Sequence, residues 1–193
     1  MKKNLAIFSS GSGTNTENII RHFENDDSVC VALVVSNKSD AFVLERVKPF
    51  SVPTVFFEKK TWSGGEDILE VLREYNICFI VLAGFLARVP DCLLHAYSDK
   101  IINIHPSLLP KFGGKGMYGA HVHQSVIAAG EKESGITIHY INEHYDEGAI
   151  ILQAKCPVLP EDTPDTLAQR VHALEYEYYP QVIEKLLAGI SVQ

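Results

Sequence analysis

Short apolar runs alternate with amphipathic segments through the first hundred residues, and this alternation constrains the fold more than any other feature. The runs at 5–8, 30–35 and 77–83 are almost entirely apolar, as expected of strands buried on both faces of a parallel sheet. Residues 65–75 instead repeat apolar side chains at helical spacing. The pattern predicts an α/β fold with an open, mostly parallel twisted sheet flanked by helices, that is, a Rossmann-like fold.

The same reasoning assigns the other elements. We expect further strands at 53–57, 100–104, 135–141 and 149–158, and helices ending near Phe23 and at 40–48, 91–97, 121–129 and 163–189. The glycine-rich stretch at 111–119 can only form a loop. Pro180 should bend or interrupt the last helix, because proline lacks the amide that the helix needs.

Length and charge exclude several classes of protein. The 193 residues suit one domain over 1–193, with no linker or repeat. A net charge of −7 without a run of Lys or Arg argues against nucleic acid as a partner. No apolar segment is long enough to cross a membrane or to form a signal peptide, so we expect a cytoplasmic protein. The oligomeric state cannot be predicted from the sequence.

The cysteines and histidines do not form a metal site in the sequence. The four cysteines include no CxxC pair, and we interpret them as small hydrophobic residues. His121 and His123 resemble a pair of metal ligands but lack a third partner. We expect them to shape a site or cap a helix, and we expect no metal ion.

Ligands of open parallel sheets bind beyond the carboxyl ends of the strands. That rule draws attention to the loops at 9–15, 84–90 and 103–119. In the first, Gly11 and Gly13 allow a tight turn, and the amides that follow would face a phosphate at the helix N-terminus. The loop is not the dinucleotide fingerprint, because Thr16 stands where the third glycine would be. The alternative is a tight turn that binds nothing.

Asn103 and His105 lie two residues apart, on the same face of the strand expected at 100–104 and its end. Polar side chains on an otherwise apolar strand are costly unless they are hydrogen-bonded or used. An amide is an uncharged donor suited to a carbonyl oxygen that gains charge, and an imidazole can carry a proton near neutral pH. The pair therefore indicates a reaction centre, with simple capping of the strand as the alternative.

Asp146 follows between two expected strands. A carboxylate there could contact an imidazole and favour its charged form. It could equally be a turn residue beside Gly148, and Glu143 and Glu147 compete for the same role.

Five motifs occur in one order over almost the whole chain: SGSGTN, VLAGFLARVP, NIHPSLLP, YDEGAIILQ and RVHALEYEYYP. Together they resemble the phosphoribosylglycinamide formyltransferases, the folate-dependent enzymes of purine synthesis. NIHPSLLP alone is shared by several enzymes that use 10-formyltetrahydrofolate. SGSGTN is more discriminating, because members of this family must hold a ribose 5-phosphate. The resemblance implies the Rossmann-like formyltransferase fold.

The resemblance also implies roles for individual residues. It assigns the ribonucleotide substrate to Gly13, Thr14, Asn15 and Glu175. It assigns the folate, the cosubstrate 10-formyltetrahydrofolate, to Leu86, Ala87, Arg88, Val89, Asn103, Asn142, Glu143, His144, Tyr145 and Asp146. It makes Asn103, His105 and Asp146 the catalytic trio, acting without a metal on a tetrahedral oxyanion.

Two departures from the family pattern stand out. The family commonly has a basic residue where this chain has Ala87, with Arg88 next. An arginine expected near the folate between 57 and 65 has no clear match, although Lys59 and Lys60 are candidates. The alternatives are a related formyltransferase or a hydrolase acting on the same folate, and a non-catalytic module that binds folate or phosphate.

Overall fold

The computed structural model describes residues 2–190. These residues form two compact units. The first unit consists of the chain up to Ile102 together with the chain from Ile183 onward. The second unit is Asn103–Val182. Seven strands are hydrogen-bonded in the order β3-β2-β1-β4-β5-β6-β7. The boundary between the two units falls inside β5, between Ile102 and Asn103. The predicted α/β fold with a mostly parallel sheet is confirmed.

The first unit contains four parallel strands in the order β3-β2-β1-β4. Their bounds are Lys3–Phe8 for β1, Val29–Ser36 for β2, Thr54–Phe56 for β3 and Ile77–Leu82 for β4. Phe8 is level with Val35 on β2 and with Leu82 on β4, so these three strands end at the same edge. Their side chains are almost all buried, which explains the continuous apolar runs.

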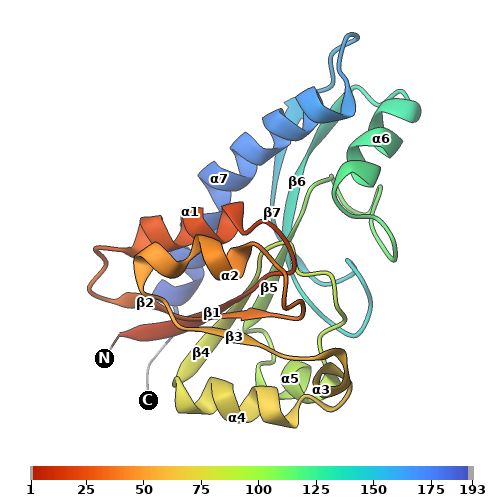
Figure 1. Cartoon of the computed structure of the whole chain (residues 1–193). Helices are drawn as coiled ribbons and strands as arrows, with labels where there is room; N and C mark the ends of the chain where they lie inside the picture. Colours follow the sequence, from red (N-terminus) through yellow and green to blue (C-terminus); the bar gives the residue numbers. More distant parts are fainter. Residues whose placement is uncertain (1, 191–193) are drawn as a thin grey trace. The chain divides into compact units, whose positions relative to one another are not determined.

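Helices cover both faces of these strands, with α1 and α2 on one side and α3, α4 and α5 on the other (Figure 1). They span Thr14–Phe23 (α1), Val43–Arg46 (α2), Lys59–Gly64 (α3), Glu66–Glu74 (α4) and Asp91–Ala96 (α5). The helix expected at 40–48 is shorter than predicted, because its second half becomes the 3₁₀ turn Lys48–Phe50 around Pro49. Helix α3 was not predicted, since KKTWSG is too short to show a periodicity.

In the second unit, β6 (Glu133–Tyr140) pairs antiparallel with β7 (Ile150–Pro157). The unit also contains α6 (Ala120–Ala128), the end of β5 (Ile101–His105) and most of α7 (Pro164–Ala188). Residues 111–119 form no helix or strand, as predicted. The expectation that Pro180 could interrupt α7 is wrong, because the helix continues through it. A missing amide removes one hydrogen bond, and the buried Tyr179 and Val182 hold the turn in place.

No helix within residues 2–190 is both long enough and apolar enough to span a membrane. All four cysteines are free thiols. Cys156 is buried and the other three are half-buried, which agrees with their interpretation as small hydrophobic residues.

Candidate active site

The glycine loop of the first unit connects β1 to α1. Gly13 stands immediately before the helix with φ +75°, a left-handed conformation that favours glycine. A Cβ at this position would lie 2.5 Å from Cγ2 of Val43, so α2 packs closely against the loop. Thr14 and Asn15 form the first turn of α1, half-buried. The loop thus has the strand–turn–helix context that anion binding requires.

A second loop, 84–90, leaves the same edge of the first unit after β4. Ser10 connects the two loops: its amide donates to the carbonyl of Gly84 (3.1 Å) and its hydroxyl accepts from the amide of Leu86 (2.9 Å). The Leu86 side chain is exposed, Val89 is buried, and Arg88 pairs with Asp91. One backbone donor of this predicted folate segment is therefore already used within the protein.

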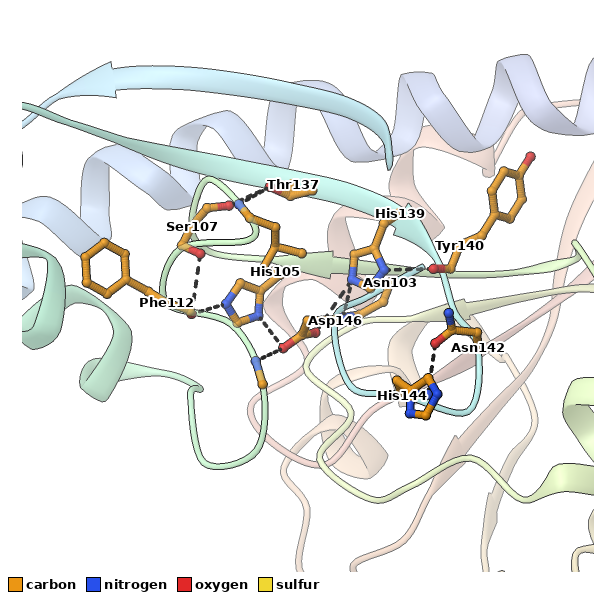
Figure 2. A network of polar contacts seen from close by, with 12 residues as sticks. Asn103, His105, Ser107, Phe112, Thr137, His139, Tyr140, Asn142, His144 and Asp146 are labelled. Atoms are coloured by element: carbon orange, nitrogen blue, oxygen red, sulfur yellow. Dashed lines mark hydrogen bonds and ion pairs between the residues drawn. The ribbon is translucent and has the colours of Figure 1, made fainter. Parts of the chain in front are cut away.

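In the second unit, Asn103 and His105 occupy the end of β5, which confirms that they share a strand face. His105 is buried, with 4 % of its surface exposed, and Asn103 is half-buried. Figure 2 shows His105 facing Asp146, which comes from the loop between β6 and β7, and Asn103 in contact with His139, which also faces Asp146. The structure thus brings the three predicted catalytic residues into one cluster.

Both ring nitrogens of His105 face oxygen atoms. Nε2 lies 2.7 Å from the carbonyl oxygen of Phe112, and Nδ1 lies 3.6 Å from Oδ2 of Asp146 (Figure 2). A carbonyl oxygen can only accept, so Nε2 carries a proton and donates it to Phe112. A second proton on Nδ1 would face a carboxylate. Each ring nitrogen of His105 therefore has a potential acceptor within the protein.

The carboxylate of Asp146 lies near two histidines, His105 and His139. It has φ +58°, and its side chain is only 12 % exposed. Burial alone would raise the pKa of its carboxyl, but His139, His105 and the amide of Gly114 hold that pKa below its usual range. The competing acids Glu143 and Glu147 are exposed instead. Of the three acids that the sequence left open, Asp146 is the one that lies beside His105 and His139.

His139 on β6 is a member of this cluster that the sequence reasoning missed. Its Nδ1 lies 2.8 Å from the carbonyl oxygen of Tyr140, so Nδ1 is the protonated nitrogen. Nε2 lies 3.3 Å from Nδ2 of Asn103 and 3.6 Å from Oδ1 of Asp146. A neutral ring accepts a hydrogen bond from Asn103, whereas a charged ring would donate to Asp146. The sequence did contain a signal for His139. Strand alternation places it on the same face as Thr137, so two polar side chains share one face of this strand.

A polar network holds the turn after β5. Thr137 donates to the carbonyl of Ser107 (2.7 Å) and accepts from the amide of Leu109 (3.0 Å). Ser107 donates to the carbonyl of Lys111 (2.7 Å), so the chain is fixed up to the residue before Phe112. A Cβ at Gly113 would lie 3.3 Å from Cβ of Asp146, so this loop approaches the carboxylate closely. The position of the Phe112 carbonyl therefore depends on β6 and on Asp146.

Glu175, the predicted substrate acid, belongs to a second cluster on α7. It is 4 % exposed and lies 2.8 Å from Nδ1 of His172. That hydrogen bond raises the pKa of His172. His123 on α6 is buried beside His172, and its burial lowers its pKa. His121, by contrast, is exposed beside Tyr118.

The remaining predicted folate residues form the exposed loop before Asp146: Asn142, Glu143, His144 and Tyr145. Its turn is held by a hydrogen bond from the His144 amide to the Asn142 side chain (2.9 Å). Lys59 and Lys60 are exposed at the start of α3. Within residues 2–190, no group of three or more His, Cys, Asp or Glu side chains is arranged to hold a metal ion.

Comparison with known proteins identifies one family over most of the chain. The sequence model of the formyl transferase family matches residues 3–183. Phosphoribosylglycinamide formyltransferase of Bacillus subtilis is 40 % identical over 190 residues, which cover 96 % of this chain and 95 % of that protein. The chloroplastic enzyme of Arabidopsis thaliana is also 40 % identical, over 94 % of this chain, but the chain spans only 64 % of its length.

Solved structures agree in fold. The phosphoribosylglycinamide formyltransferase of Bacillus halodurans has a TM-score of 0.87 and 41 % identity, over 97 % of this chain and 96 % of that one. The enzyme of Anaplasma phagocytophilum has a TM-score of 0.88 and 35 % identity, over 97 % and 88 % of the two chains. Sequence and fold point the same way, and the chain belongs to the formyl transferase family.

Proposed function

We propose that this chain transfers the formyl group of 10-formyltetrahydrofolate to the amine of 5′-phosphoribosylglycinamide, a step of de novo purine synthesis. Membership of the formyl transferase family supports this proposal. Relatives from both a plant and a bacterium are named phosphoribosylglycinamide formyltransferase, which supports it further. The family model runs through both units, which supports our proposal that 1–193 work as a single formyltransferase domain. We further propose that the enzyme is cytoplasmic and that its partners are small molecules.

The observation that carries this proposal is the cluster of Asn103, His105 and Asp146. It contains an amide donor, an imidazole with acceptors at both nitrogens, and a carboxylate whose pKa is lowered. These three groups suit acyl transfer to an amine, because an oxygen gains negative charge while a nitrogen loses a proton.

The reaction passes through a tetrahedral intermediate. The amine lone pair forms a bond to the formyl carbon, and the carbonyl oxygen becomes an oxyanion. Asn103 and the imidazolium of His105 donate hydrogen bonds to that oxygen. One such donor is typically worth about 3–4 kcal/mol of the barrier. Asp146 holds the charge on His105 and, through water, takes the proton that leaves the attacking amine. The oxyanion then collapses to the carbonyl, the C–N bond to the folate breaks, and the same proton is delivered to the leaving folate nitrogen.

His139 acts in this scheme as a positioning residue for Asn103. An asparagine amide has two N–H groups. Nε2 of His139 lies 3.3 Å from Nδ2 of Asn103, and this contact holds the Asn103 side chain in one orientation with an N–H available for the oxyanion. His105 must in addition exchange its Phe112 partner for the oxyanion, since Nε2 has a single proton.

The ligand-binding roles extend the same proposal. The amides of Gly13, Thr14 and Asn15 hold the phosphate, and Glu175 holds another part of the ribonucleotide. The segments Leu86–Val89 and Asn142–Tyr145 hold the folate. The half-buried turn at Gly13 and the burial of Glu175 support the first assignment. No metal is needed, because the formyl group is already activated by its attachment to the folate.

A spectroscopic assay of tetrahydrofolate formation tests the proposal. We expect turnover of 10-formyltetrahydrofolate that requires 5′-phosphoribosylglycinamide. Turnover that ignores the ribonucleotide would instead indicate a hydrolase. Binding of both ligands without turnover would indicate a non-catalytic module. Asn103→Ala should lower kcat about 100-fold or more with little change in folate affinity; Asn25→Ala, at an exposed asparagine outside the proposed site, is the control.

A further inference from the structure

Three consecutive carbonyl groups of the glycine loop accept hydrogen bonds from within the protein. Gly11 accepts from the amide of Val43 (3.0 Å), Ser12 accepts from Nε of Arg46 (2.6 Å), and Gly13 accepts from the amide of Glu17 (2.9 Å). Within residues 2–190, the amides that follow these three carbonyls have no hydrogen-bond acceptor. Those amides belong to Ser12, Gly13 and Thr14.

In a trans peptide the C=O and N–H bonds point in opposite directions. Fixing a carbonyl on one side of the loop therefore directs the next amide to the other side. A row of such amides is the arrangement that proteins use to bind anions through the backbone. Two of the three carbonyls are fixed by backbone amides. The third, that of Ser12, is fixed by a side chain, and this side chain is Arg46.

Arg46 is itself held tightly. Its Nη1 donates to Oε2 of Glu17 (2.7 Å), and its guanidinium lies over the ring of Phe42 with 5.1 Å to the centroid. Glu17 belongs to α1 and also pairs with Arg21 (2.8 Å). The two members of the Arg46–Glu17 pair are only 26 % and 24 % exposed. One guanidinium thus connects α2, the loop and α1 through its planar set of donors.

We propose that Arg46 is a positioning residue for the phosphate of the substrate. It fixes the peptide plane between Ser12 and Gly13, so that the Gly13 amide faces the anion before the anion arrives. The charge of Arg46 is balanced by Glu17, so the residue acts through the backbone and does not itself contact the ligand. This inference rests on the proposed function, in which the loop holds the phosphate of a ribonucleotide.

The test compares Arg46→Met with Arg21→Met. Methionine keeps an unbranched apolar side chain and removes every donor, and Arg21 shares the partner Glu17 without contacting the loop. The affinity for 5′-phosphoribosylglycinamide is measured by calorimetry, beside that for the same compound without its phosphate. Arg46→Met should lose about tenfold in affinity for the ribonucleotide, the equivalent of one hydrogen bond. It should lose nothing for the dephosphorylated compound, and Arg21→Met should match the wild type for both.

Steady-state kinetics give the second reading. Arg46→Met should raise KM for the ribonucleotide while kcat and the folate KM stay constant. Arg46→Lys should recover part of the loss, because an ammonium can reach the Ser12 carbonyl but cannot also serve Glu17 in the same plane. If Arg46→Met does not fold, Arg46→Lys and Glu17→Gln carry the same comparison with smaller shifts.

Three outcomes are separated by this design. A wild type that binds phosphorylated and dephosphorylated compounds equally would overturn the proposed phosphate site, and Arg46 with it. A wild type that prefers the phosphate, with Arg46→Met keeping the whole preference, would overturn the role of Arg46 alone. Weakening of both compounds in Arg46→Met would also overturn it, because that pattern marks a general structural defect.

Discussion

The glycine loop of the first unit and the Asp146 cluster of the second are built on opposite plans. The glycine loop offers backbone amides, which carry no titratable proton and whose directions are set by peptide planes. The Asp146 cluster offers side chains that exchange protons and that are held by one another. Backbone suits a ligand with a constant charge, such as a phosphate, whereas side chains suit an atom whose charge changes during reaction. The two regions should therefore fail in different ways when they are altered.

The largest effect is expected from His105→Asn in the side-chain cluster. Asparagine keeps a neutral donor but cannot become an imidazolium, so we expect kcat to fall by about 100- to 1,000-fold. KM for the ribonucleotide should hardly change, because the glycine loop is intact. Single-turnover rates at saturating ligand measure the effect, with His95→Asn, at an exposed histidine of α5, as the matched control. A large rise in KM with constant kcat would contradict the division of labour between the two regions.

Gly13→Ala should damage the glycine loop in the reverse manner. The new methyl group would meet Val43 in a backbone conformation that alanine avoids, which should destabilise the protein by about 1–3 kcal/mol. It should also raise KM for the ribonucleotide about tenfold while leaving kcat close to normal. Gly11→Ala is the control, since a Cβ there meets no atom within 4 Å. Urea unfolding and initial rates provide the two measurements, and equal effects of the two substitutions would be the contrary result.

The smallest effect concerns the dependence of stability on pH. The pKa of Asp146 is lowered in the folded protein, so its carboxylate stabilises the fold above pH 3.8, the ordinary value for an aspartate. That contribution disappears as the pH falls from 3.8 through the lowered pKa. Asp146→Asn should therefore flatten the acid limb of the stability curve, whereas Glu147→Gln should not. Denaturant unfolding at a series of pH values checks this, and parallel curves for wild type and Asp146→Asn would be the contrary finding.

The fold could be predicted from the sequence because its strands are buried on both faces. Burial on both faces requires a continuous apolar run, which can be recognised in a short stretch of sequence. Asn103 and His105 could also be recognised from the sequence, because they are polar residues on such an apolar strand. Asp146 was not, because a left-handed backbone conformation distinguishes it from Glu143 and Glu147, and that conformation depends on the folded loop. His139 was missed although strand alternation marked its position.

Arg46 shows a different limit of sequence reasoning. Its partner Ser12 lies 34 residues away, and the contact involves a carbonyl group, which every residue has. Nothing in the letters LER therefore indicates that this arginine sets the direction of a distant amide. Likewise, the shortening of the helix expected at 40–48 follows from Pro49 and the 3₁₀ turn around it. The elements could be predicted from local patterns, whereas the contacts between them required the structure.

The hydrogen bond from His105 to the Phe112 carbonyl also affects how tightly ligands can bind. The Phe112 carbonyl already accepts the single proton on Nε2 of His105, so it competes with any ligand that would accept the same proton. Because the carbonyl belongs to the same chain, this competition is the same at every protein concentration. Any inhibitor designed to accept from His105 binds only the fraction of molecules in which this carbonyl has withdrawn. Its apparent dissociation constant is therefore its intrinsic constant divided by that fraction. A compound that leaves the Phe112 contact in place and uses Asn103 alone escapes this penalty.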